Sequence, residues 1–161
     1  AASSRYRGVE LSIDQPLGDA FTTALSCSRG DSHFNEFTDA DGNRFYDNRI
    51  PGIPRNQLFA SLDYQPGEKL GTLLSARWVG KRCADNANTA KADGYVVFGF
   101  HRSYRVKLAD SEVRFYGDID NLCDETYDDN LRINAACGPF FEPAPERSFF
   151  LAISVTGRPG R

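Results

Sequence analysis

The sequence has few of the residues that build metal and catalytic centres. It holds two histidines and four cysteines, and no two cysteines stand in a C-x-x-C pair. A structural zinc site needs closely spaced sulfur and nitrogen ligands, so the sequence predicts no metal site. Phosphate-binding glycine loops, a Cys/His nucleophile pair and a nucleophile elbow are missing as well. We therefore expect no enzyme, no catalytic residue and no cofactor.

An excess of one charge and long apolar runs are also absent. The 19 basic and 22 acidic residues are interspersed and give a net charge of −3, so nucleic acid is not expected as a partner. No run of eighteen apolar residues exists, which excludes a transmembrane helix but not spanning strands, because strands alternate in polarity. The first residues lack a basic start followed by an apolar run, so no signal peptide is expected. Either it was removed or the sequence is part of a longer chain.

Apolar and polar residues alternate in seven segments, and a period of two indicates strands with unlike faces. Over residues 57–64, Leu58 and Leu62 fall on one side and Ser61 and Asp63 on the other. The seven predicted strands cover residues 5–14, 21–28, 57–64, 70–82, 95–106, 112–122 and 148–156.

The connections alternate between short turns and long polar loops. The turns lie near residues 15–19, 65–69 and 107–111, and the loops span residues 29–55, 83–93 and 123–147. A soluble sandwich has no reason to sort its loops by length, whereas membrane barrels have short turns on one side. We predict an all-β fold, an antiparallel transmembrane β-barrel segment of about seven strands with short periplasmic turns and long extracellular loops. Aromatic residues near strand ends fit interfacial girdles: Tyr6, Tyr64, Trp78, Tyr95, Tyr104 and Phe149.

Each face of such a sheet has its own expected surroundings. Apolar residues predicted to face lipid are Val9, Leu11, Ile13, Leu58, Leu62, Leu74, Phe98, Val113, Ile119, Leu151 and Ile153. Charged residues predicted to face the lumen are Glu10, Asp14, Asp63, Arg77, Arg114 and Asp118. Seven strands cannot close a single-chain bacterial barrel, and an open edge in lipid leaves backbone groups unpaired. The remaining strands are expected from another chain or an upstream region.

Five local strings, taken in order, resemble the C-terminal part of the β-barrel of TonB-dependent outer-membrane receptors. They are RYRGVEL at residues 5–11, NRIPGIPR at 48–55, ARWVGKR at 76–82, IDNL with DETY at 119–127, and FEPAPERS at 141–148. The resemblance covers nearly the whole chain. It divides the sequence into a barrel portion, residues 1–156, and a tail, residues 157–161.

The resemblance implies a part in the energised uptake of a siderophore, a metal complex or a cofactor, in the bacterial outer membrane and without catalysis. The implied partners are outer-membrane lipid, and missing strands and a plug supplied by another chain or an upstream region. TonB would act only indirectly, because in the family the plug contacts it. An alternative is an outer-membrane or soluble β-sheet subunit that binds or supports partner chains and does not transport.

The long loops hold the candidates for ligand contact. These are Asp39, Asp41, Asp47, Asp85, Asn86, Asp128 and Asp129. Charges in exposed loops also serve solvation, so both roles are open. A calcium loop starting at Asp39 is disfavoured, because position twelve is Ile50 and not a bidentate glutamate. Cys123 and Cys137 lie in one predicted loop and can form a disulfide in an oxidising compartment, although free thiols are equally compatible.

Overall fold

The computed structural model describes residues 2–133 and 140–157, and every regular element within them is a strand. The strands are β1 (Ser3–Leu17), β2 (Phe21–Thr38), β3 (Arg44–Phe45), β4 (Asn56–Tyr64), β5 (Leu70–Val79), β6 (Arg82–Cys83), β7 (Lys91–Ala92), β8 (Tyr95–Lys107), β9 (Ser111–Asp120), β10 (Asp128–Arg132), β11 (Phe140–Pro143) and β12 (Ser148–Gly157). These two ranges contain no helix that could span a membrane. The predicted all-β class is confirmed.

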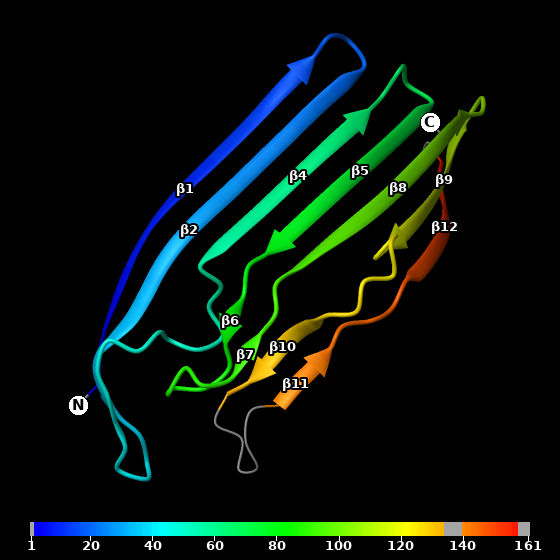
Figure 1. Ribbon diagram of the computed structural model, residues 1–161. Coiled ribbons are helices and arrows are strands. Elements are labelled where there is room, and N and C mark those ends of the chain that lie inside the picture. The colour runs from blue at the N-terminus through cyan, green and yellow to red at the C-terminus, as the bar shows by residue number, and fades with distance from the viewer. Residues whose placement is uncertain (1, 134–139, 158–161) are drawn as a thin grey trace.

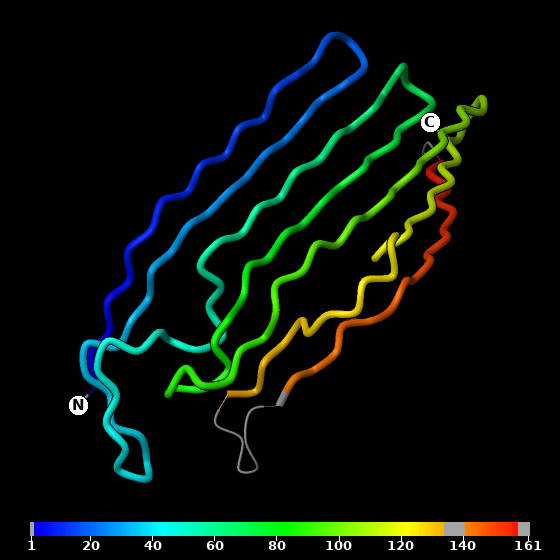
Figure 2. The backbone as a smooth tube through the Cα atoms, viewed as in Figure 1, coloured from blue at the N-terminus to red at the C-terminus, as the bar shows by residue number. Residues whose placement is uncertain are grey.

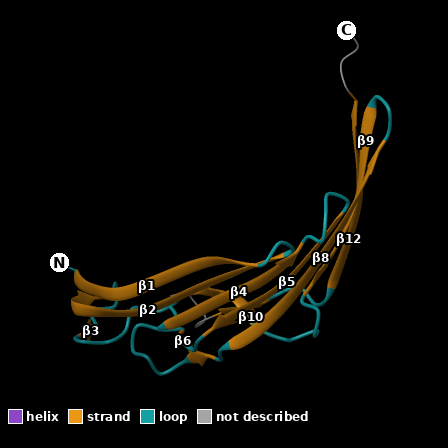
Figure 3. Ribbon diagram, turned by 90° about the horizontal axis from the view of Figure 1, so that it is seen from above, coloured by secondary structure: helices purple, strands orange, loops and turns teal. Residues whose placement is uncertain are grey.

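Seven long strands form one antiparallel sheet in the order β1-β2-β4-β5-β8-β9-β12 (Figure 1). Each long strand therefore pairs with the next one along the chain. The short strand β3 adds to β2, and the pairs β6-β7 and β10-β11 are small sheets within the loops. Seen from above, the sheet curls along its width and does not close on itself (Figure 3). This is the shape of one part of a barrel wall.

Turns and loops are sorted to opposite ends of the sheet (Figure 2). The connections β1–β2, β4–β5 and β8–β9 are short and lie at one end, while the connections β2–β4, β5–β8 and β9–β12 are long and lie at the other. In the first short turn Gly18 adopts a φ of 71°, a conformation that side chains with a Cβ rarely take. The predicted alternation of turns and loops is confirmed.

The first hairpin is longer than predicted. Strand β2 continues to Thr38, so residues 29–38 form a strand where the sequence predicted a loop. This part pairs with the start of β1, for example Tyr6 with Ser32, but the β4 ladder reaches only Arg29. The extension therefore does not pair with β4. Both of its faces carry polar residues, so its sequence shows no alternation of apolar and polar residues from which a strand could be predicted. The second and third predicted loops likewise contain the short pairs β6-β7 and β10-β11.

One face of the sheet is apolar and exposed, and we call it the outer face. The strand register brings all eleven residues predicted to face lipid onto it, as in the row Leu58–Trp78–Val96. Leu151 is 84% exposed and Val9 is 75% exposed. No large side chain in the described ranges is fully buried, and the buried apolar residues gather at the long-loop end. Nothing in the described chain covers the outer face with a second layer.

The opposite, inner face carries the charged residues. The six residues predicted to face a lumen share this face, because each lies at the other parity of its strand. They include Asp118, whose Oδ1 lies 2.5 Å from Nδ1 of His101. The girdle prediction holds for Tyr64, Trp78, Tyr104 and Phe149, which lie on the outer face. It is wrong for Tyr6 and Tyr95, because their strand positions place both on the inner face.

Candidate functional site

Three long loops meet at one end of the sheet, and their mutual contacts define the candidate site. The first long loop covers residues 39–55, the second covers 80–94 and the third covers 121–147, of which 134–139 lie outside the described ranges. Side chains tie the first loop to the β1–β2 hairpin, the second loop to the first, and the third loop to the second. The loop end is therefore a connected structure.

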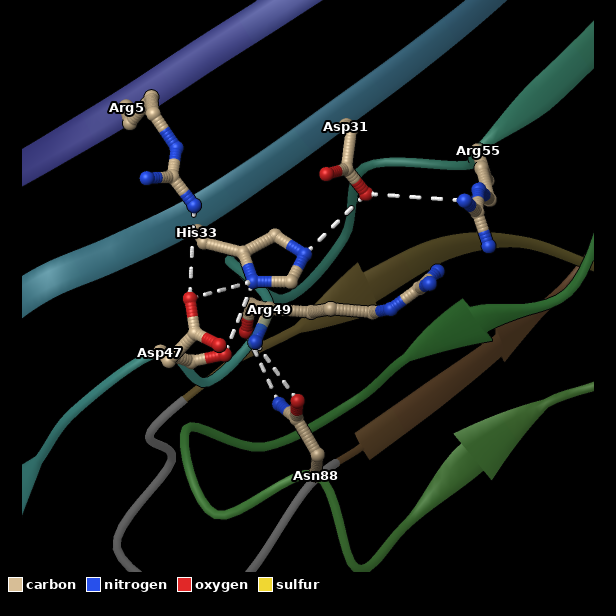
Figure 4. A network of polar contacts seen from close by, with 7 residues as sticks. All are labelled: Arg5, Asp31, His33, Asp47, Arg49, Arg55 and Asn88. Atoms are coloured by element: carbon tan, nitrogen blue, oxygen red, sulfur yellow. Dashed lines mark hydrogen bonds and ion pairs between the residues drawn. The ribbon is translucent and has the colours of Figure 1, made fainter.

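The first loop is held by His33 on the β2 extension (Figure 4). Nε2 of His33 lies 3.2 Å from Oδ1 of Asp31, and Nδ1 lies 2.9 Å from the carbonyl oxygen of Asp47. Arg5 on β1 reaches Asp47 at 3.5 Å, and Arg55 reaches Asp31 at 4.0 Å. The His33 side chain is only 16% exposed, so it is clasped between the strand and the loop.

Asparagine side chains join the first loop to the second. Asn88 donates from Nδ2 to the carbonyl oxygen of Arg49 (2.9 Å) and accepts from the Arg49 amide at Oδ1 (2.7 Å). Asn48 donates to the carbonyl oxygen of Asn86 at 2.9 Å. Asn88 makes its contacts with a φ of 62°, a left-handed conformation that asparagine tolerates better than most residues.

The third loop folds onto the inner face through a group that we call the Tyr95 cluster, made of Arg77, Arg82, Tyr95, Tyr127 and Asp129. The rings of Tyr95 and Tyr127 lie 4.1 Å apart, centroid to centroid. Arg82 is buried and donates to the carbonyl oxygens of residues 128 and 129, the latter at 3.0 Å. Arg82 therefore fixes the third loop to the second.

Charge and aromatic surface come together in the Tyr95 cluster. The guanidinium carbon atoms of Arg77 and Arg82 lie 5.5 and 5.8 Å from the Tyr95 ring centroid, within cation–π range. The Tyr95 hydroxyl donates to Oδ1 of Asp129 at 3.2 Å, and Nη1 of Arg77 lies 3.7 Å from the same oxygen. The Arg77 side chain is 47% exposed, so a cation beside an aromatic pair remains accessible from the inner side. Such a group suits an anionic or aromatic ligand.

Several of the predicted ligand residues stabilise their own loops. Asp39 accepts the amides of Asp41 (3.0 Å) and Asn43 (2.8 Å) through Oδ1. Hydrogen bonding from the Asn43 side chain, with smaller help from backbone amides, holds the pKa of Asp39 below its ordinary value. Asp85 in the second loop accepts the Ala90 amide at 3.1 Å. Asp39 and Asp85 thus act as turn caps.

The remaining candidates lie in the contacts between loops. Asp47 belongs to the His33 contacts, Asp129 to the Tyr95 cluster, and Asn86 is 7% exposed with its carbonyl bonded to Asn48. Asp128 offers its backbone carbonyl to Arg82. Ligand binding by these residues stays a prediction. Of the proposed disulfide, Cys123 is exposed and Cys137 lies outside the described residues.

The sequence did not single out Arg82, Tyr95 and Tyr127 as partners. They come from β6, β8 and the third loop, so no local spacing signals that they meet. At the other end of the inner face, a groove of about 610 Å³ lies beside the short turns. Its charged lining includes Asp63, Lys69, Arg105 and Arg114. Asp63 and Arg114, both predicted to face a lumen, therefore line one polar groove.

Solved structures share this fold. The ferric citrate transporter FecA in its unliganded form has a TM-score of 0.83 at 18% identity, covering 96% of this chain and 25% of that one. The siderophore receptor PiuA from Acinetobacter baumannii has a TM-score of 0.74 at 21% identity, with 94% and 22% covered. The copper transporter OprC has a TM-score of 0.70 at 23% identity, with 93% and 22% covered. The chain thus spans about a quarter or less of the length of these proteins.

A family match agrees with the architecture. Residues 1–122 match the family described as TonB dependent receptor-like, beta-barrel. This is a family of transport receptors rather than enzymes, and its members lie in the bacterial outer membrane. The curled sheet, the sorted loops and the apolar outer face described above are the features expected of its barrel wall. The chain therefore belongs to the β-barrel family of TonB-dependent receptors of the bacterial outer membrane.

Proposed function

We propose that the chain is the C-terminal portion of the barrel, residues 1–156, of a receptor that takes up a siderophore, metal complex or cofactor with energy supplied through TonB. The observation that carries the proposal is the division of one curled sheet into two unlike faces, with all three long loops at one end. An exposed apolar outer face fits contact with hydrocarbon, and an inner face of ion pairs fits a polar interior. A soluble β-sheet module would cover its apolar face.

The connected long loops support a role in ligand capture. Loops that bind ligands are more effective when they are ordered beforehand, because less entropy is lost on binding. Here the clasp of His33, the asparagine contacts and the Tyr95 cluster link all three loops to the sheet. The half-exposed Arg77 beside two tyrosine rings offers charge and stacking to an anionic complex, such as a metal held by carboxylate or catecholate groups.

A plug domain is the proposed partner of the inner face. The groove beside the short turns presents Asp63 and Lys69 together with Arg105 and Arg114, so both signs of charge are available to a polar segment. Glu112 holds Arg105 and Arg114 through its Oε1, at 3.2 Å from each. A preformed ion-pair network of this kind orients donors toward a partner that enters the barrel.

Uptake by whole cells tests the proposal. Cells that make or lack the protein carrying this chain are supplied with radiolabelled iron or copper, presented as citrate, catecholate or hydroxamate complexes. We expect accumulation of at least one complex that requires the protein and stops when an uncoupler removes the proton-motive force. Accumulation that continues in uncoupled cells would indicate a passive pore. No difference between the two strains for any complex would contradict the proposal.

An arginine variant tests the loop end. Arg77→Gln should raise the half-saturating concentration of an anionic complex about tenfold, because one charge-assisted contact is lost. The maximal rate should stay the same. Lys81→Gln is the matched control, because Lys81 pairs with Asp93 at 2.9 Å and is 72% exposed, outside the Tyr95 cluster. Equal effects of the two substitutions would show that only the overall charge of the loops matters.

A further inference from the structure

Arg102 lies on the apolar outer face toward the short turns, whereas Arg7 and Arg29, at the same parity on β1 and β2, lie toward the long loops. Arg102 on β8 stands between Thr72 on β5 and Gly117 on β9 in the strand register. On its own strand the neighbours of the same parity are Phe100 and Tyr104. Arg102 is exposed, and among the described residues it has no ion pair and no side-chain hydrogen bond. A charge on the lipid side of a barrel is costly unless an anion meets it there.

An apolar groove begins beside this arginine. It has a volume of about 700 Å³ and is lined on the outer face by Arg102, Tyr104, Phe115, Gly117, Leu151 and Ile153. The groove exists because Gly117 has no side chain where every neighbouring position on the outer face carries one. A Cβ built at Gly117 would come within 2.9 Å of Cδ2 of Leu151. The groove thus joins one cation to a wall of aliphatic and aromatic groups.

The position of Arg102 along the sheet places it toward the short turns. Its register row runs through Thr72 to Tyr64 and Phe21, whose rings stack at 4.5 Å beside those turns. Tyrosine rings of this kind sit where hydrocarbon gives way to headgroups. Arg102 therefore lies near the boundary of the leaflet on the short-turn side, within reach of its headgroups.

We propose that Arg102 and the Gly117 groove bind one phospholipid of the leaflet on the short-turn side. The guanidinium would hold the headgroup phosphate through paired hydrogen bonds, and an acyl chain would lie along Tyr104, Phe115 and Leu151. A phosphodiester is the anion that a bilayer supplies at this depth, and the apolar lining matches hydrocarbon. The inference rests on the proposed barrel in an outer membrane and adds a lipid site to it.

Native mass spectrometry of the protein extracted from outer membranes in detergent tests the site. The probes are phosphatidylglycerol, a diacylglycerol with the same acyl chains, and inorganic phosphate. We expect one phosphatidylglycerol to bind with an affinity that falls about tenfold in Arg102→Gln. Diacylglycerol should bind the wild-type protein and Arg102→Gln equally weakly, and millimolar inorganic phosphate should not displace the lipid.

Two further variants separate the parts of the site. Gly117→Leu should fill the groove and weaken phosphatidylglycerol binding to a similar extent, with the charge retained. Arg44→Gln is the control, because Arg44 is exposed on β3 at the long-loop end of the sheet and should leave lipid binding unchanged. Circular dichroism and heat-modifiable migration on gels confirm that each variant is folded.

The outcomes that overturn the site are specific. If the wild type and Arg102→Gln bind phosphatidylglycerol with equal affinity, the arginine does not take part in lipid binding. If inorganic phosphate displaces the lipid, the site binds anions in general and is not specific for a phospholipid. Equal affinity for diacylglycerol and phosphatidylglycerol would show an apolar surface without headgroup recognition, and a protein dimer without bound lipid would show that a second copy covers the groove. Failure of metal-complex uptake with lipid binding intact would count against the proposed function alone.

Discussion

A leucine pair on β5 gives a direct test of which face meets hydrocarbon. Leu74 lies at the middle of the strand on the outer face, opposite Leu62 and Phe100, and is 47% exposed. Its neighbour Leu73 lies on the inner face, opposite Asp63 and His101. Leu74→Arg and Leu73→Arg therefore make the same chemical change at adjacent positions on opposite faces.

The expected magnitudes differ because the surroundings differ. An arginine on the lipid side costs about 2–4 kcal/mol of stability near the bilayer midplane, and this cost falls to about 1 kcal/mol or less at the interfaces. Leu74→Arg should therefore lower the free energy of unfolding by about 2–3 kcal/mol. Leu73→Arg should change it by less than about 1 kcal/mol, because the new charge meets water and the carboxylate of Asp63.

Guanidinium unfolding of the whole protein in phospholipid vesicles, followed by circular dichroism, measures the difference. Midpoints convert to free energies only where the slope of the transition is unchanged, so both are compared. Equal losses in the two variants, or a greater loss for Leu73→Arg, would refute the assignment of the outer face to lipid.

Three further predictions concern the loops and a close backbone contact. The folded-state pKa of Asp39 is below its ordinary value of 3.8, so its hydrogen bonds stabilise the turn above that pH and are lost as pH falls through the folded pKa. Hydrogen-exchange protection of residues 39–43, measured relative to the intrinsic exchange rate at each pH, should therefore fall below about pH 4, and Asp39→Asn should remove this pH dependence. Arg82→Met should raise hydrogen exchange in β10 about tenfold, because two carbonyl acceptors lose their donor, and unchanged exchange would show that the third loop is held elsewhere. Gly94→Ala should cost about 1–3 kcal/mol in thermal or denaturant unfolding, since its Cβ would meet the Val79 carbonyl oxygen at 2.7 Å, whereas Gly67→Ala, with nothing within 4 Å, should be nearly neutral.

The sheet could be predicted from the sequence where one side of a strand is apolar. Leu58, Ala60 and Leu62 stand at every second position of β4, and this strand lies close to its predicted limits. Residues 29–38 show where this signal ends. Both faces of that stretch are polar, as Asp31 and Ser32 illustrate, so a strand there has no period of two to detect. Its pairing with residues 3–9 of β1, and at its end with β3, reveals it.

The loop-end site could be predicted only in part. Arg77 was predicted to face the lumen and Asp129 to contact a ligand. The sequence did not predict that the two residues meet, because their contact depends on how the third loop folds over β8. Tyr95 was predicted to be a girdle residue because it is aromatic and stands at the start of an alternating strand. Its position one residue from Val96, which lies on the outer face, sends it to the opposite side. Local composition thus locates aromatic residues along a strand, while the register decides their face.

The pairing of each long strand with its successor has a kinetic consequence. Every ladder in the sheet closes across one connection, and the longest runs from residue 121 to 147. The entropy of closing a loop grows only with the logarithm of its length, and topologies rich in contacts between neighbouring segments fold faster than those that join distant ones. The β1–β2, β4–β5 and β8–β9 hairpins can therefore form early and independently. The β2–β4 and β5–β8 connections then determine how fast these hairpins pair with one another, and the β9–β12 connection determines how fast β12 is added.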